Sequence, residues 1–347
     1  MSAAASLRAG AAKSRSTPAG AGSRATASTG AQRRRLDLGR WHFQHGPIDC
    51  IVSADGDDAA VAAAIEAAWA RFQTLLAELV GELALLRSDL SAGVPVMPRG
   101  PVARRMVAAC RPHGQGGRFI TAMAAVAGSV AEELLGAFDD PRIARASINN
   151  GGDIALRLTP GTAFAVGVCA DPRRGVAGLP LDGRFTVAAS SPVRGIATSG
   201  WRGRSFSLGI ADSVTVLATS ASRADAAATI VANAVDVDDA RIGRAPASAV
   251  RDDSDLGDRL VVRAVPPLPP ALVDAALARG ADEARAQIDA GRIIAAVLSL
   301  QGRWRVVRAV GATTGIGVEC AGGVDVDGAR SAAPLRSPHT ARAVAVG

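Results

Sequence analysis

Tyrosine is absent from this 347-residue sequence, lysine occurs once, and aromatic residues make up only 3% of the chain. The four cysteines are isolated, without a Cys-x-x-Cys pair or the spacing of a zinc site, so we expect reduced thiols and a cytoplasmic protein. Long apolar runs are missing too. The longest segments without a charged residue, Phe119–Ala131 and Leu158–Ala170, have 13 residues, whereas a transmembrane helix needs about 20. The sequence therefore predicts no membrane span.

Acidic residues are absent from the first 36 positions, which contain seven of the 39 Lys and Arg residues. The other 32 basic residues equal the 32 Asp and Glu residues in number, so the net charge of +7 comes from this segment alone. The rest of the chain has no basic stripe, which argues against a nucleic-acid partner. A segment of Ala, Gly, Ser and Arg buries too little apolar surface to offset its chain entropy, so we expect residues 1–39 to form a disordered basic tail.

Apolar residues make up 48% of the chain, and their spacing separates into blocks of helices and blocks of strands. Helical spacing predicts helices over 57–90, 102–110, 123–138, 223–235 and 271–290. Alternating runs bounded by Gly and Pro predict a hairpin over 41–52 and strands over 146–149, 153–158, 163–168, 185–189, 196–198, 214–218, 260–265 and 293–300. This order favours an α+β fold of two-layer antiparallel sheets with packed helices over residues 40–310. We expect an acidic loop over 236–258 and a loose C-terminal tail over 311–347.

Two glycine-containing turns are candidates for ligand contact. In Asn149–Asp153 the paired glycines would let a ligand approach main-chain N–H groups, although Asn-Gly is also the strongest signal for a plain hairpin turn. In Gly195–Arg202 the hydroxyls of Thr198 and Ser199, next to Gly200, suit a phosphate or a ribose. A strand that ends in a polar turn would have the same pattern. Taken alone, neither turn decides between ligand binding and structure.

A third segment, Ser222–Thr229, is a candidate cation site. On a helix Asp225 and Thr229 are four residues apart and share a face, and carboxylate and hydroxyl oxygens suit Mg²⁺. The alternative is structural, because the serine at the start of this segment lies three residues before Asp225, the spacing of a helix capping box. Cys110 and His113 could also bind a metal, but no second pair of ligands accompanies them.

Together these segments resemble the ApbE-like superfamily. Its motifs Asn-x-Gly-Gly-Asp, Ala-Thr-Ser-Gly and Ala-Asp-Ala-x-Ala-Thr occur here in the same order, at 149–153, 197–200 and 224–229. The segments 166–172 and 213–216 are similar to two further strand motifs of the superfamily. The flanking segments are most similar to its branch of uncharacterised ApbE-related proteins, which extends the resemblance over about residues 40–303; they are 43–49, 121–128, 253–258 and 291–302.

The characterised members of the superfamily are FAD:protein FMN transferases, which use Mg²⁺ to move the FMN moiety of FAD to a Thr or Ser of an acceptor protein. The resemblance implies an internally duplicated α+β body of the T-fold type, with a pocket for FAD or a related flavin nucleotide. It matches Asp225 and Thr229 to the Mg²⁺ ligands. The residues that it implies in nucleotide contact are Asn150, Gly151, Gly152, Asp153, Thr198, Ser199 and Gly200.

Two departures from the transferase pattern bear on activity. After Ala-Thr-Ser-Gly the transferases usually carry a His-x-x-Asp-Pro segment, whereas this chain continues with Arg204–Asp212, and no histidine lies between His113 and His339. The role of general acid or base is therefore vacant, unless His42 or His45 of the predicted hairpin takes it. The superfamily also often stacks the flavin ring on a tyrosine, which this chain lacks. Substitutes would be Trp41, Trp69 and Trp201.

Two hypotheses of different classes remain. In the first, the protein binds a flavin or another nucleotide-like ligand and does not transfer it. In the second, it is a Mg²⁺-dependent FAD:protein FMN transferase, or an enzyme that cleaves a pyrophosphate, and a transferase would need an acceptor protein as a further partner. The vacant histidine position favours the first hypothesis, and the intact Asp225 and Thr229 favour the second.

Overall fold

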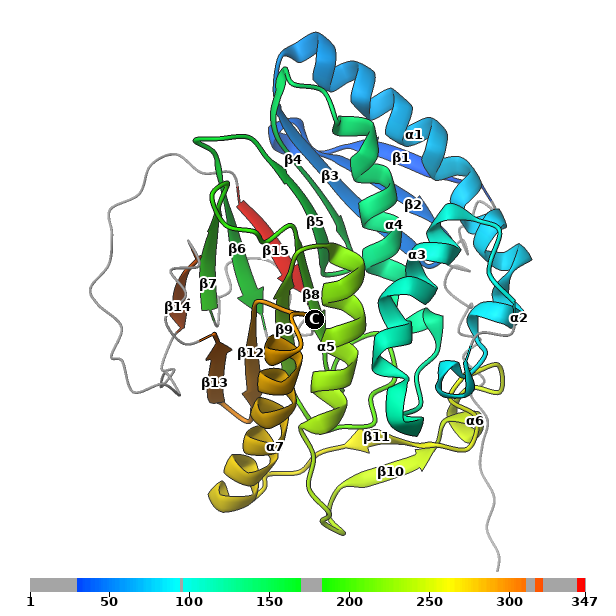
Figure 1. Cartoon of the computed structure of the whole chain (residues 1–347), viewed down its shortest axis with the longest axis vertical. Coiled ribbons are helices and arrows are strands. Elements are labelled where there is room, and N and C mark those ends of the chain that lie inside the picture. The colour runs from blue at the N-terminus through cyan, green and yellow to red at the C-terminus, as the bar shows by residue number, and fades with distance from the viewer. Residues whose placement is uncertain (1–29, 94–95, 170–182, 310–315, 321–341, 347) are drawn as a thin grey trace, which may run out of the picture.

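The computed structural model of the protein describes residues 30–93, 96–169, 183–309, 316–320 and 342–346. Within these residues a long β-sheet separates a layer of helices from a second, smaller sheet (Figure 1). Two segments with sequence-based predictions lie outside the described residues. They are residues 1–29, predicted to be disordered, and residues 170–172, the end of a strand motif.

Nine strands form the large sheet, and every neighbouring pair in it is antiparallel. Their spatial order is β1-β2-β3-β4-β5-β8-β9-β12-β13. The bounds are β1 Gln32–Arg35, β2 Trp41–His45, β3 Ile48–Gly56, β4 Ile143–Asn150, β5 Asp153–Leu158, β8 Gly195–Ser199, β9 Ser213–Ala218, β12 Ala295–Leu300 and β13 Arg303–Arg308. The predicted first hairpin is confirmed as β2 and β3.

Helices cover one face of this sheet and bury the apolar side chains that the strands direct toward them (Figure 1). The α-helices are α1 Asp58–Gly81, α2 Leu83–Leu86, α3 Pro101–Cys110, α4 Val126–Leu135, α5 Ala221–Ala234, α6 Ala247–Val250 and α7 Pro270–Asp289. Short 3-10 turns are found at Asp37–Gly39, Leu90–Ala92, Arg111–His113, Gln115–Gly117, Ala122–Ala125 and Gly136–Phe138. Helix α1 begins as predicted, because the carboxylate of Asp57 caps it by accepting the N–H of Ala60 (2.9 Å).

The smaller sheet packs against the opposite face, over β5, β8 and β9. Its order is β14-β7-β6-β15, with bounds β6 Ala163–Cys169, β7 Gly183–Ala188, β14 Ile316–Cys320 and β15 Arg342–Val346. The pair β6–β15 is parallel and the other pairs are antiparallel. Phe164 and Phe185 of this sheet meet Ile154 and Leu156 of β5 in the core between the two sheets. A separate ribbon of β10 Gly243–Pro246 and β11 Leu260–Ala264 lies across the ends of α3 and α5 (Figure 1).

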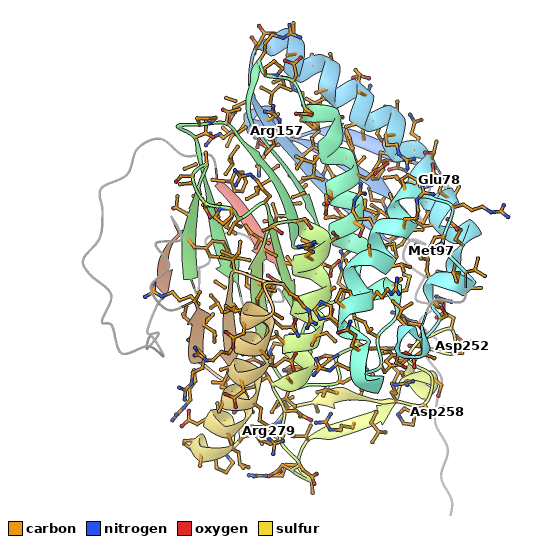
Figure 2. The ribbon with its side chains drawn as sticks, in the orientation of Figure 1. Glu78, Met97, Arg157, Asp252, Asp258 and Arg279 are labelled. Carbon is orange, nitrogen blue, oxygen red and sulfur yellow. The ribbon has the colours of Figure 1, made fainter. Side chains whose placement is uncertain are left out.

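The predicted α+β class, with antiparallel sheets and packed helices, is confirmed. The internal duplication stays a prediction. Among the described residues no helix has the length and apolar character needed to span a bilayer. Cys50 and Cys110 are buried free thiols, as their isolation in the sequence predicts. Charged side chains lie at the periphery, among them Glu78 on α1, Arg279 on α7, and Asp252 and Asp258 next to α6 (Figure 2).

Several boundaries differ from the prediction, among them the end of α1, which lies at Gly81 and not near residue 90. Strand β1 lies inside the segment predicted as a disordered tail, and it pairs with β2 although all four of its side chains are exposed. Main-chain hydrogen bonds hold it, and these need no apolar side chains. Strands β14 and β15 lie in the predicted loose C-terminal tail, and β10 and α6 lie in the predicted acidic loop. Strand β13 was not predicted. It follows β12 through a tight turn at Gln301 and Gly302, both of which have positive φ.

Candidate functional site

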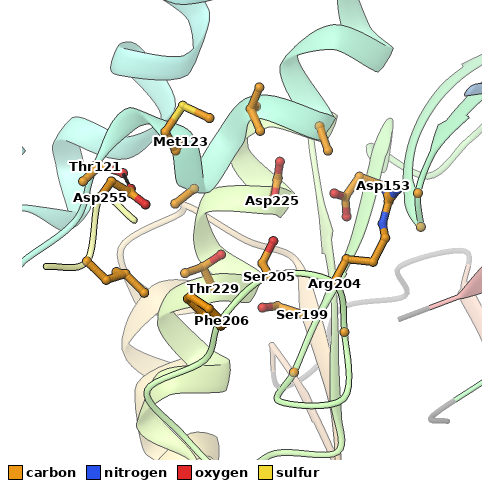
Figure 3. Close-up of a pocket in the computed structure, with 18 of the residues that line it drawn as sticks. Thr121, Met123, Asp153, Ser199, Arg204, Ser205, Phe206, Asp225, Thr229 and Asp255 are labelled. Atoms are coloured by element: carbon orange, nitrogen blue, oxygen red, sulfur yellow. Dashed lines mark hydrogen bonds between the residues drawn. The ribbon is translucent and has the colours of Figure 1, made fainter. Parts of the chain in front are cut away.

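A pocket of about 800 Å³ opens where the end of β4, the start of β5 and the end of β8 meet the start of α4 and one face of α5. All three segments singled out in the sequence contribute to its wall (Figure 3). The loop at 251–256, between α6 and β11, closes another side. The fold therefore brings together residues that are far apart in the sequence, from Asp49 to Leu256.

The turn between β4 and β5 forms the first part of the wall. Gly151 and Gly152 line the pocket and both have positive φ, 65° and 115°, a conformation that a glycine adopts readily. The Gly152 N–H donates to the side-chain oxygen of Asn149 (2.8 Å), which also lines the pocket. The segment is therefore a plain hairpin turn and, at the same time, a part of the pocket wall, so the two alternatives do not exclude each other.

Asn150 differs from the prediction, because it is not among the residues that line the pocket. Its side chain is buried and bridges three elements instead. The Oδ1 atom accepts the N–H of Asp49 on β3 (3.2 Å), and the Nδ2 atom donates to the carbonyl of Ala127 at the start of α4 (3.2 Å). Asn150 therefore holds the turn in place against α4 and does not face a ligand.

Strand β8 supplies Thr198, Ser199 and Gly200, all of which line the pocket as predicted. The Thr198 N–H donates to Oδ1 of Asp153 (3.1 Å), and this bond fixes the carboxylate at the start of β5. Gly200 passes so close to the carbonyl of Asp212 that a Cβ atom would lie 2.5 Å from it. The glycine is required here by close packing of the chain.

Helix α5 carries Asp225 and Thr229, and both line the pocket. The capping-box alternative is wrong: Ser220, not the serine two residues later, caps the helix by accepting the N–H of Arg223 (3.5 Å). The carboxylate of Asp225 turns away from its own helix and accepts the N–H of Gly128 in α4 (2.9 Å). A Cβ atom at Gly128 would collide with the carbonyl of Ala221, so this glycine permits the contact between the two helices.

Two carboxylates with raised pKa values, those of Asp153 and Asp225, lie among the charged groups that line the pocket. Asp153 is 8% exposed, and burial raises its pKa, against the smaller opposing effects of the Thr198 N–H and the charge of Arg204. Burial also raises the pKa of Asp225, and the nearby charge of Asp153 raises it further. Two like charges in one poorly solvated site are costly, and a bound cation is the usual way in which proteins balance them.

The donor set fits a hard cation. Figure 3 shows the carboxylates of Asp153 and Asp225 and the hydroxyl of Thr229 directed into one space. Mg²⁺ is commonly held by one or two carboxylates, with waters and substrate phosphates filling the other positions. In the described part of the chain no group of three or more His, Cys, Asp or Glu residues could hold a metal by itself, so such an ion would depend on the hydroxyl, on water and on a ligand.

The histidines lie elsewhere. The Nε2 atom of His42 is 2.7 Å from Oδ1 of Asp49, and Asp49 lines the pocket while His42 does not. The ring of His45 packs near Phe72 in the helical core. His113 is buried, and desolvation lowers its pKa to about 4. None of the three histidines discussed above, all in the described part of the chain, lines the pocket.

The predicted aromatic substitutes also lie outside the pocket. Trp41 and Trp69 pack in the core beneath α1, and Trp201 donates its indole N–H to Asp212 (3.2 Å). The pocket is instead lined by Phe119 and Phe206, both half-buried. Sequence reasoning missed these two because neither lies in a motif that was assigned to the ligand.

Further lining residues were not assigned a role from the sequence. Arg204 lies beside Asp153 (Figure 3), and the hydroxyl of Thr121 donates to the carboxylate of Asp255 (2.5 Å) at the other end of the pocket. Thr121 and Asp255 belong to two of the flanking segments that resemble the ApbE-related branch. That shared similarity was the available signal for them, whereas Arg204 lies in a segment noted only for its missing histidine.

Comparison with known proteins places these features in context. The chain is 38% identical over 139 residues to a UPF0280 protein of Methanopyrus kandleri, covering 40% of this chain and 51% of that protein. It is 39% identical over 140 residues to a UPF0280 protein of Methanosphaerula palustris, covering 39% and 54%. The chain thus spans about half the length of the curated relatives that it matches.

A crystal structure of the ApbE protein from Thermotoga maritima covers 81% of this chain and 96% of its own, with a TM-score of 0.39 and 14% identity. A likeness of this degree says nothing about function. The sequence model of the family described as "AbpE bacteria", however, matches residues 32–306, most of the chain. The protein therefore belongs to this ApbE-related family, as its motifs predict.

Proposed function

We propose that this protein binds a flavin nucleotide, or a related nucleotide, through its phosphates in the pocket, together with Mg²⁺ held by Asp225, Asp153 and Thr229. The observation that carries the proposal is the convergence of the buried carboxylate of Asp153, the half-buried carboxylate of Asp225 and the hydroxyl of Thr229, from β5 and α5. Bound there, Mg²⁺ would neutralise the two carboxylates and attract phosphate oxygens.

The remaining wall suits the rest of such a ligand. A volume of about 800 Å³ lies in the range of small-molecule and cofactor sites. The rings of Phe119 and Phe206 offer apolar contact for a planar ring system, in place of the tyrosine that the chain lacks. The glycine turn presents main-chain groups at close range.

Calorimetric titration of the full chain with FAD, FMN and ADP, each with and without Mg²⁺, tests this proposal. We expect FAD or FMN to bind the wild-type chain only when Mg²⁺ is present. In the Asp225→Asn variant, addition of Mg²⁺ should no longer increase the affinity for either flavin. Asp282→Asn is the matched control, because Asp282 is exposed on α7 and does not line the pocket. Failure of all three ligands to bind the wild-type chain with Mg²⁺ would contradict the proposal.

The second candidate is catalysis: transfer of FMN from FAD to a hydroxyl of an acceptor protein, or hydrolysis of FAD to FMN and AMP. The intact group of Asp153, Asp225 and Thr229 favours it, because the same residues that hold Mg²⁺ would stabilise charge on a pyrophosphate. The absence of an imidazole among the lining residues that the structure describes favours binding alone. Release of AMP from FAD and Mg²⁺, measured by chromatography with and without candidate acceptor proteins, separates the two.

A further inference from the structure

Arg204 occupies an unusual position at the edge of the pocket. It lies in the loop that follows β8, and its guanidinium reaches across to the β4–β5 turn, near Asp153 (Figure 3). The Nη2 atom lies directly against Gly151, in the space that a Cβ atom on this residue would need. Gly151 therefore serves two purposes: its positive φ forms the turn, and its missing side chain admits the guanidinium.

The other arginines that line the pocket already have close partners. Arg202 donates to Asp212 (2.7 Å), Arg87 donates to Asp253 (3.2 Å), and Arg251 lies over the ring of Phe206 (5.3 Å to the centroid). Arg204 differs, since within the residues that the structure describes it makes no hydrogen bond or ion pair. Its charge acts at longer range, where it lowers the pKa of Asp153 and of the Cys50 thiol against the larger effect of burial.

The charge balance of the pocket leaves Arg204 available for an anion. A divalent cation would neutralise Asp153 and Asp225, and the guanidinium charge would then remain beside that cation. A guanidinium stays protonated at all physiological pH values, so it cannot act as a general base. Its planar set of N–H donors matches two phosphate oxygens at once.

We propose that Arg204 binds a phosphate of the ligand, next to the cation site of Asp153 and Asp225, in the loop where the resembling transferases carry a histidine. This inference rests on the proposed function and names the group of the ligand that the pocket recognises, a phosphate or pyrophosphate. Through Arg204, the loop after β8 gives the pocket a permanent positive charge. It does not give the pocket a group that can donate or accept a proton during a reaction.

Calorimetry with inorganic pyrophosphate and Mg²⁺ as the probe tests this role without any flavin. We expect Arg204→Gln to weaken pyrophosphate binding about 10- to 100-fold, the usual loss for a hydrogen bond to a charged group. Arg204→Lys should recover part of this loss, because it keeps the charge and lacks the planar donor set. Arg223→Gln, which removes an exposed arginine of α5 outside the pocket, should bind like the wild type.

Binding of Mg²⁺ alone distinguishes a phosphate contact from damage to the site. Removal of a positive charge near the two carboxylates should leave Mg²⁺ affinity unchanged or raise it. The proposal is overturned if Arg204→Gln weakens Mg²⁺ and pyrophosphate equally, or leaves pyrophosphate binding unchanged.

Comparison of FMN with riboflavin, which lacks the phosphate, separates this inference from the proposed function. If wild-type FMN binding is tighter than riboflavin binding and the gap closes in Arg204→Gln, both proposals are supported. If pyrophosphate binding depends on Arg204 but no flavin binds, the role of Arg204 stands and the flavin proposal fails. If FMN binds wild type and Arg204→Gln equally, the flavin proposal stands and the role of Arg204 fails.

Discussion

Asp153 of β5 and Asp225 of α5 direct their carboxylates into the same pocket, and the charge of Asp153 raises the pKa of Asp225. Each carboxylate is held by a main-chain N–H group from a different element, Thr198 of β8 for Asp153 and Gly128 of α4 for Asp225. The pair is therefore fixed before any ligand arrives. Placing two carboxylates in one poorly solvated site costs stability whenever both are charged.

The first prediction concerns that stability. Burial raises the pKa of Asp153 to about 7 and raises that of Asp225 as well, so in this range the folded chain binds more protons than the unfolded chain. The free energy of unfolding of the metal-free protein should therefore fall as pH rises from about 4 to about 7. Asp225→Asn removes one charge and keeps an acceptor for the Gly128 N–H, so it should stabilise the chain by about 1 kcal/mol at pH 8.

Thermal unfolding of both proteins at pH 5 and pH 8, without Mg²⁺, measures this effect. The gain should be smaller at pH 5, where the wild-type pair already carries a proton. A melting temperature that drops by several degrees at both pH values would instead assign Asp225 a structural role.

Mg²⁺ binding should depend on pH in the opposite sense. Carboxylates coordinate a cation only when deprotonated, so the Mg²⁺ affinity should fall between pH 8 and pH 6. The fall should be up to about tenfold per pH unit for each proton that a carboxylate must release when Mg²⁺ binds. At pH 8, Thr229→Val should weaken Mg²⁺ binding while Thr229→Ser, which keeps the hydroxyl, should not. Calorimetry measures all of these values. Equal affinities for the Val and Ser variants would remove Thr229 from the cation site.

Gly128 should tolerate no side chain. A Cβ atom there would collide with the carbonyl of Ala221 and approach the Cβ of Asp225 to 3.0 Å, so α4 and α5 would have to separate. Gly128→Ala should destabilise the protein by about 1–3 kcal/mol in denaturant unfolding and weaken Mg²⁺ binding. Gly136→Ala is the control, since nothing lies within 4 Å of a Cβ at that position. Comparable losses in the two variants would mean that the helix contact is not the cause.

Asp212 should hold the loop that carries Arg204. Its Oδ1 atom accepts from the Trp201 indole (3.2 Å) and from Arg202 (2.7 Å), and its Oδ2 atom accepts the N–H of Gln301 (2.6 Å). Asp212→Ala would leave these donors without their acceptor, and we expect a loss of about 3 kcal/mol in the free energy of unfolding. Ligand affinity should fall with it. Denaturant unfolding with calorimetry of the folded variant checks both, and unchanged stability would exclude this role.

Much of the fold could be predicted from the sequence because its signals are local. The apolar stripe after Asp57 and the alternation around Gly46 predict α1 and the β2–β3 hairpin. Strand β1 could not be predicted, because Gln32–Arg35 contain no apolar side chain and pair with a strand outside their own segment, while Arg33 contacts Glu66 and Trp69 of the distant helix α1. The same limit applies to β14 and β15, whose partners β7 and β6 lie far back along the chain.

For the site, six of the seven residues that motif similarity assigned to nucleotide contact line the pocket, as do Asp225 and Thr229, which it assigned to a cation. Asn150 was the exception, because a motif does not reveal that one of two adjacent asparagines turns toward Ala127. The lining aromatics, Phe119 and Phe206, and the pair of Thr121 and Asp255 could not be assigned, since each comes from a loop whose position depends on distant elements.

The sequence by itself determined most of the helices and strands whose signals are local, which residue types carry chemistry, and the family to which the chain belongs. Only the tertiary structure decided that Asp225 faces a pocket instead of capping its helix, that Asp153 joins it, and that Arg204 lies against Gly151. The physical reason is that periodicity and capping act over a few residues. The pocket, by contrast, exists only once α4 and α5 pack closely at Gly128 and bring the ends of β5 and β8 beside them.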